Sequence, residues 1–235
     1  MDGRIEHGFR ARFRALAASS GVVDPAGEAD RLVAGAIATA KGAGVPPVRA
    51  LADAWLRALA RAKELPRGSA PPPWVLFDDE RPPRFVCDPS LAGLARWLRA
   101  AGYEALVAPD VPGHRLPDEA LRRGLVLLTT DAEVLDRRIV AGGSLAVVWV
   151  PSALTMAEQL HLVSVELGLT RREPRCMACG GALVPSPKED VRPRIPPRTA
   201  LWKDEYFVCA GCDRLFWRGT HWERIEKTLR GAVAA

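Results

Sequence analysis

Two aspartates that each follow a short apolar run are the residues best placed for chemistry. Asp88 follows the run at 84–87, Asp131 follows the run at 125–130, and a helical pattern comes after each. In a parallel α/β sheet, the carboxyl ends of the strands share one edge, where ligands bind. Two carboxylates held close there repel each other, and a hard divalent cation such as Mg²⁺ or Mn²⁺ relieves that repulsion. The pattern therefore predicts metal-assisted hydrolysis.

Asp118 and Glu119 are the candidates for a third acidic ligand, because they open a predicted helix at 117–123. Each acid also has a simpler interpretation. Carboxylates in the first turn of a helix compensate its dipole, and the spacing from Thr130 to Glu133 fits a capping box. The shared position of the acids at one predicted sheet edge favours the metal site over the caps.

The cysteines form two C-x-x-C pairs, Cys176 with Cys179 and Cys209 with Cys212. Each pair places two thiolates on one tight turn, and two such turns close a tetrahedral four-thiolate site with no open position. We therefore predict a structural Zn²⁺, with a redox dithiol as the alternative. The fifth cysteine, Cys87, is expected to be a small residue of the core.

The elements that position these residues follow from hydrophobic periodicity. Residues 84–168 alternate short apolar runs with helical patterns, which is typical of a parallel sheet flanked by helices. We expect strands at 84–87, 104–107, 125–129 and 145–150, and helices at 91–101, 117–123, 132–140 and 154–167. Residues 5–64 predict two or three further helices, with Pro25 and Pro47 near helix starts.

Composition changes along the chain predict four segments. These are a helical N-terminal region at 1–70, a proline-rich linker at 71–83, the α/β domain at 84–170 and a cysteine-containing domain at 171–235. No apolar run approaches the roughly 20 residues of a membrane span, and the start of the chain has no apolar signal region. We therefore expect a cytoplasmic protein that does not insert into membranes.

The net charge of +5 is spread unevenly. Residues 84–170 carry 8 basic and 10 acidic side chains, whereas residues 171–235 carry 13 basic and 8 acidic ones. A cationic tail beside an acidic centre suits a polyanionic substrate, because one part binds phosphates while the other binds metal. A solvated basic surface is the alternative. No P-loop or dinucleotide-binding glycine motif occurs, so a nucleotide cofactor has no support.

From residue 84 to about residue 229, the sequence resembles the Mut7-C RNase family, a PIN-like nuclease domain with an appended zinc ribbon. The motifs that carry the resemblance are FVCD at 85–88, LAGLARWLR at 91–99, LLTTD at 127–131, the cysteine quartet, and FWRGTHW at 216–222. The resemblance implies a metal-dependent ribonuclease that binds its catalytic ion through Asp88, Asp131 and either Asp118 or Glu119. The chain departs from the family pattern at Pro89-Ser90, at Thr130, and at Pro151-Ser152, where a PIN-like site often has a further acid.

Basic and aromatic side chains supply candidate RNA contacts, through phosphate binding and base stacking. The alternatives are an ordinary solvated surface for the arginines and packing against a small zinc core for the tryptophans. The candidates are Arg96 and Arg99 after the first aspartate, Arg192, Arg194 and Arg198 between the cysteine pairs, and Trp217, His221 and Trp222 near the end.

Two other functions compete with a ribonuclease. The first is a non-catalytic RNA-binding module, associated with ribosomes or tRNA, that keeps the fold with an incomplete site. The second is an adaptor whose N-terminal helices recruit a protein partner.

Overall fold

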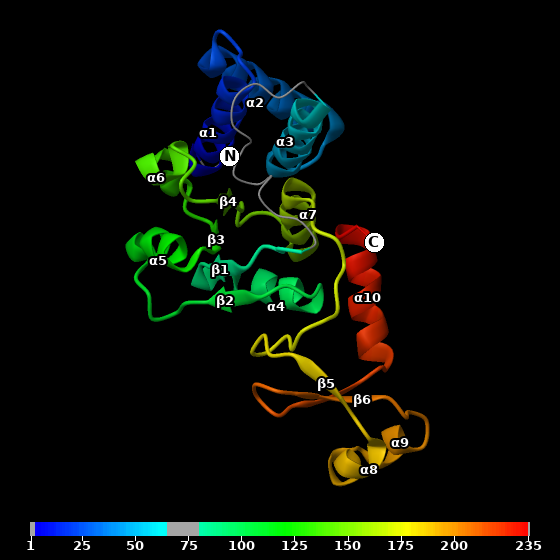
Figure 1. Ribbon diagram of the computed structural model, residues 1–235. Helices are drawn as coiled ribbons and strands as arrows, with labels where there is room; N and C mark the ends of the chain where they lie inside the picture. The colour runs from blue at the N-terminus through cyan, green and yellow to red at the C-terminus, as the bar shows by residue number, and fades with distance from the viewer. Residues whose placement is uncertain (1–2, 65–79, 235) are drawn as a thin grey trace.

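The computed structural model describes residues 3–64 and 80–234. Most of the expected linker lies in residues 65–79, outside the described residues. The described chain contains three N-terminal helices, a four-stranded parallel sheet flanked by helices, and a C-terminal three-stranded antiparallel sheet (Figure 1). The predicted α/β fold class is therefore confirmed, including the helical segment before the sheet and the cysteine cluster after it.

The parallel sheet has the strand order β2-β1-β3-β4. Its strands are β1 (Phe85–Cys87), β2 (Ala105–Val107), β3 (Val126–Thr129) and β4 (Val147–Trp149), close to the predicted positions. The central pair sets the geometry of the site, because Cys87 of β1 lies opposite Leu128 of β3 in parallel register. The residues that follow these two strands therefore emerge side by side at the same edge.

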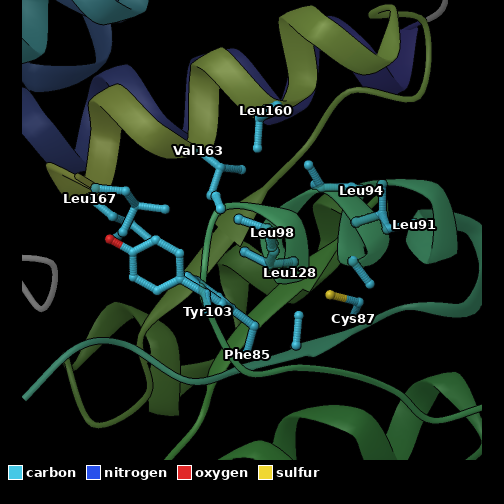
Figure 2. Close-up of a cluster of buried hydrophobic side chains, with 14 of the residues drawn as sticks. Phe85, Cys87, Leu91, Leu94, Leu98, Tyr103, Leu128, Leu160, Val163 and Leu167 are labelled. Atoms are coloured by element: carbon cyan, nitrogen blue, oxygen red, sulfur yellow. The ribbon is translucent and has the colours of Figure 1, made fainter. Parts of the chain in front are cut away.

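Alternating side chains of the strands pack on opposite faces of the sheet, as the pleat requires. Phe85, Cys87 and Leu128 face the helices α4 (Ala92–Ala100) and α7 (Met156–Leu167), as Figure 2 shows. The neighbouring residues Val86 and Leu127 face α5 (Leu116–Arg123). The thiol of Cys87 is fully buried, and this burial raises its pKa to about 12, so Cys87 is a core residue as predicted.

The predicted continuous helix at 132–140 is wrong. The structure has a 3₁₀ helix, η4 (Ala132–Asp136), then a short helix, α6 (Arg138–Ala141), separated by Arg137 in extended conformation. The break allows the apolar side chains of this segment to pack into two different cores. Leu135 packs toward the N-terminal helices, whereas Val134 and Ile139 pack against the sheet. A single regular helix would present one apolar stripe and could not face both.

The N-terminal helices are α1 (Gly3–Ser19), α2 (Pro25–Ala43) and α3 (Pro47–Glu64). They pack directly on the α/β domain. The ring of Phe9 meets the edge of Trp149 of β4 with 5.2 Å between centroids, and Phe13 contacts Trp55 in the same cluster. Leu162 of α7 completes this shared core, so the N-terminal helices and the α/β domain bury one apolar surface together.

The C-terminal sheet consists of β5 (Leu183–Ser186), β6 (Tyr206–Cys209) and β7 (Leu215–Trp217). The proline-rich segment between the cysteine pairs contains short helices. It forms α8 (Lys188–Val191), η5 (Arg192–Arg194) and α9 (Pro197–Ala200), with Val191 and Ile195 packed against Tyr206. The last helix, α10 (Thr220–Ala232), lies against α7 and inserts Leu229 into the α/β core. Across residues 3–64 and 80–234, no helix has the length and apolar character needed to cross a bilayer.

Candidate active site and zinc centre

Asp88 lies at the carboxyl end of β1, held in place by the next strand. Its backbone N–H donates to the carbonyl of Leu128, and Oδ1 of its side chain accepts from the N–H of Ser90 at 2.9 Å and from the Ser90 hydroxyl at 2.8 Å. The hydroxyl of Thr129 donates to Oδ2 at 3.4 Å. Asp88 therefore caps η2 (Pro89–Leu91) with one oxygen and meets a β3 hydroxyl with the other.

Asp131 follows β3, three residues beyond Leu128, where the register with β1 ends. Its N–H donates to the Thr129 hydroxyl at 3.1 Å, so that hydroxyl connects the two aspartates. Oδ1 of Asp131 accepts from the N–H of Glu133, which makes Asp131 the N-cap of η4. The predicted capping box beginning at Thr130 is therefore wrong, because the cap lies one residue later. Both aspartates are therefore helix caps. Each uses only Oδ1 for the cap, so its second carboxylate oxygen is not part of the cap.

The N-terminal helix forms one wall of the space beside Asp131. A cavity of about 640 Å³ there is lined by Asp131 and Thr130 on one side and by Arg4 and His7 of α1 on the other. His7 Nε2 lies 3.0 Å from a carboxylate oxygen of Asp136. Sequence reasoning missed this contribution, because the chain separates α1 from the aspartates by more than a hundred residues and only packing brings them together.

The predicted ring of three acids does not form. In the part of the chain that the structure describes, the one group of three or more His, Cys, Asp or Glu ligand atoms within 4.8 Å of one another is the cysteine quartet. Glu119 instead forms ion pairs with Arg122 at 2.7 Å and Arg123 at 3.5 Å, and its hydrogen bond with Arg122 lowers its pKa. Asp118 is exposed in the first turn of α5. The sheet edge therefore gathers two carboxylates and three hydroxyls, from Ser90, Thr129 and Thr130.

The four cysteines converge from two turns. Sγ of Cys176 lies 3.7 Å from Sγ of Cys212, and Sγ of Cys179 lies 3.4 Å from Sγ of Cys209. Cys176 and Cys209 are buried, whereas the second cysteine of each pair is exposed. The turns approach closely at Gly181, where a Cβ atom would lie 2.8 Å from Sγ of Cys209. Four thiols at this spacing could bind one structural zinc ion.

The electrostatics of the quartet also suit a metal. Burial alone would raise the pKa of Cys209, but hydrogen bonds from the backbone of Gly211 and Cys212 and from neighbouring thiols lower it to about 7. The other thiols raise the pKa of Cys212 to about 12, against a backbone hydrogen bond from Arg214. Clustered thiols cannot all ionise together, and a divalent cation removes that conflict by stabilising every thiolate.

A family model described as the Mut7-C RNAse domain matches residues 83–229, which is more than half of the chain. The chain belongs to the Mut7-C RNAse domain family. No curated protein and no solved structure matches it. Membership of the Mut7-C family gives the chain a ribonuclease-type or RNA-related role, with RNA as substrate or partner. The match covers both the sheet edge and the cysteine quartet.

The prediction that Arg99 is an exposed RNA contact is wrong. It is 7% exposed, and its guanidinium donates to the carbonyls of Ala105, Met177 and Ala178 at 2.7 to 3.1 Å. Arg99 therefore joins α4 to the first cysteine turn and cannot reach RNA. Arg96, one turn earlier, is exposed as expected.

The other predicted RNA contacts fall into two groups. Arg192, Arg194 and Arg198 are exposed on the small helices between the cysteine pairs, where Arg192 pairs with Glu189 and Arg194 with Asp213. The second group lines a cavity of about 500 Å³ between the C-terminal sheet and α10. Its members are Trp217, His221 and Trp222, joined by Arg218, which the sequence interpretation overlooked despite its place between the tryptophans.

We expect the purified full-length protein to contain about one zinc per chain. A Cys176→Ala/Cys209→Ala variant should lose it, because two of four thiolates leave and the remaining pair cannot close a tetrahedral site. Elemental analysis measures the content directly. Cys87→Ala is the matched control, since it removes the cysteine of the core and should keep the zinc. Full zinc retention in the double variant would contradict the assignment.

Proposed function

We propose that this protein is a metal-dependent ribonuclease that hydrolyses RNA phosphodiester bonds at the edge formed by Asp88 and Asp131. The observation that carries the proposal is their position after two adjacent parallel strands, joined through the Thr129 hydroxyl, in a chain of the Mut7-C family. The donor set fits the ion, since carboxylate and hydroxyl oxygens are the hard ligands that Mg²⁺ and Mn²⁺ prefer.

In this proposal, Asp88 and Asp131 would hold the ion. A bound Mg²⁺ or Mn²⁺ supplies charge stabilisation to the phosphate and a more acidic water. The protein contributes orientation. Ser90 donates to Asp88 and lies 3.1 Å from the Thr130 hydroxyl, so the ends of β1 and β3 are fixed relative to each other before substrate arrives. Arg4 and His7 of α1 add cationic or proton-donating groups to the cavity wall where an RNA phosphate would lie.

The exposed arginines between the cysteine pairs are proposed to bind the RNA backbone. They lie on a C-terminal region with 13 basic and 8 acidic side chains. Backbone contacts of this kind supply affinity without sequence preference. Arg96, exposed on the helix that follows Asp88, is proposed as a phosphate contact closer to the cleaved bond.

A non-catalytic RNA-binding module is the second candidate, and one observation favours it. Within residues 3–64 and 80–234, no third carboxylate joins Asp88 and Asp131 in a tight metal-binding group. Such a module would bind RNA with the same basic surface and leave it intact.

We expect cleavage of a 5′-labelled single-stranded RNA to require added Mg²⁺ or Mn²⁺. The protein should first be dialysed so that it keeps its zinc but carries no other divalent ion, and then be supplied with each metal separately. A denaturing gel reads the products. Restoration by Mg²⁺ or Mn²⁺ but not by further Zn²⁺ would support the ribonuclease. Bound but intact RNA under every metal would support the binding module instead.

A further inference from the structure

A mainly apolar cavity beside α10 joins parts of the molecule that lie far apart in sequence. Its walls come from the end of α4, from residues 171–175, from β7 and from the first turns of α10, around a volume of about 500 Å³. Sites for small ligands and single nucleotides commonly have a volume in this range. The parts that meet here are the α/β core, the C-terminal sheet with its cysteine quartet, and the helix α10 that lies between them (Figure 1).

The aromatic side chains of the cavity are positioned by contacts with their neighbours. Trp222 stacks on Phe207 with 6.0 Å between ring centroids and 18° between planes, and its Nε1 donates to Glu226 at 2.9 Å. Phe207 lies outside the cavity lining, so it supports the indole from behind while Trp222 lines the hollow. Trp217 packs against the core of the C-terminal sheet. An indole fixed before binding loses little conformational entropy when a ligand stacks on it.

The charge of the lining is complementary to phosphate. Four arginines contribute to it, whereas its acidic members are Glu173 and Glu226, and Arg218 also pairs with the exposed Glu205 at 3.3 Å. The guanidinium of Arg218 lies 5.8 Å from the Phe207 ring and 5.9 Å from the Trp222 ring, which places a cation directly beside the stacking surface. Aromatic faces interleaved with arginines are the combination that binds single-stranded nucleic acid.

The cavity lies away from the proposed cleavage edge. Asp88 precedes α4, whereas Ala100 and Ala101, which line the cavity, are at the far end of that helix. A helix of 9 residues is about 14 Å long at 1.5 Å per residue. The cavity and the proposed cleavage edge thus lie at opposite ends of α4, about one length of this helix apart.

We propose that this cavity binds one unpaired nucleotide of the RNA substrate, with its base stacked on Trp222 and its phosphate at Arg218. The inference deepens the proposed function and rests on it for the identity of the ligand as RNA. The site would select RNA with an unpaired segment, since a base within a duplex cannot enter the cavity and stack. It would also anchor the substrate at a fixed distance from Asp88 and Asp131.

The test measures binding separately from cleavage. Fluorescence polarisation of a labelled, unstructured 12-nucleotide RNA is recorded with zinc-loaded full-length protein in an Asp88→Asn background, so that the RNA stays intact. We expect Trp222→Leu and Arg218→Gln each to weaken binding about tenfold, the typical loss when one stacked base is released. Trp222→Phe, which keeps an aromatic face, should retain most of the affinity. Trp202→Leu is the matched control, because Trp202 is 80% exposed outside the cavity.

A second arm identifies the base itself. RNAs carrying a single abasic nucleotide at successive positions should show one position at which the parent protein loses about tenfold in affinity. At that position Trp222→Leu should cause no further loss, because the stacked base is already absent. Additive losses at every position, or equal weakening of a blunt duplex, would overturn the proposal. This result is independent of catalysis, which is measured separately with protein that keeps Asp88. No cleavage by that protein together with coupled losses removes the ribonuclease but keeps the cavity site, and cleavage together with additive losses does the reverse.

Discussion

Replacing Asp88 with asparagine should lower the rate of metal-dependent RNA cleavage by at least about 100-fold. Disturbing groups that merely support metal ligands typically costs 10 to 100-fold, so loss of a charged ligand should cost more. The fold should survive. An asparagine Oδ1 can still accept from the N–H and hydroxyl of Ser90, and asparagine caps helices about as well as aspartate does.

The measurement is a single-turnover cleavage time course at saturating Mn²⁺, with the melting temperature recorded separately on protein without Mn²⁺. We expect that temperature to stay equal or to rise, because the substitution removes repulsion between Asp88 and Asp131 in the metal-free protein. Asp53→Asn is the matched control, an exposed aspartate on α3 that should leave cleavage unchanged. Undiminished cleavage by Asp88→Asn would show that the activity came from another site or from a contaminant.

Replacing Glu166 with alanine should lower the free energy of unfolding by about 3–5 kcal/mol, the usual cost of leaving a buried charge without its partner. Glu166 of α7 is 2% exposed and forms an ion pair with Arg12 of α1, which is 5% exposed. Its carboxylate also accepts from Trp55 Nε1 at 3.0 Å, and the Arg12 guanidinium lies 4.2 Å from the centroid of the Trp55 ring. One carboxylate thus ties two N-terminal helices to the α/β domain.

Urea unfolding measured by circular dichroism gives the free energy. Glu28→Ala is the control, since Glu28 forms an exposed pair with Arg31 on α2, and the loss of such a pair changes stability little. An Arg12→Met/Glu166→Leu double variant should recover most of the lost stability, because it removes both charges together. A cost for Glu166→Ala no larger than that of Glu28→Ala would show that the network does not hold the helices in place.

This anchoring changes how an adaptor role for the N-terminal helices can be tested. Deleting residues 1–70 would remove Phe9, Phe13 and Trp55 and expose Trp149 and Leu162, their partners in the shared core. The truncated chain should therefore aggregate, whatever the helices bind. Substitutions on the outer face of α2, such as at the exposed Lys41, are the cleaner probe of a protein partner.

Local patterns were sufficient where one short segment fixes the outcome. The alternation of apolar runs and helical periods predicted the strands of the parallel sheet, because each strand needs only a few β-forming residues between turns. The spacing within each C-x-x-C pair likewise predicted a tight turn, and two such pairs predicted the quartet, whose sulfur atoms all lie within 4.8 Å of one another. Asp88 and Asp131 could be predicted to lie at one edge of the sheet, because the carboxyl ends of parallel strands lie along the same edge.

Tertiary packing decided what the sequence could not. Arg99 has the spacing of a surface residue, yet it is buried because the first cysteine turn folds back over α4. Glu119 was, with Asp118, a candidate for the third acidic ligand, yet it forms ion pairs with two arginines one turn along the same helix. Contacts between segments far apart in the chain determine the roles of Arg4, His7 and Arg12. Such contacts also form the cavity beside α10. Hydrophobic periodicity within one segment does not predict such contacts, because their energy comes from surfaces that meet only after the whole chain has folded.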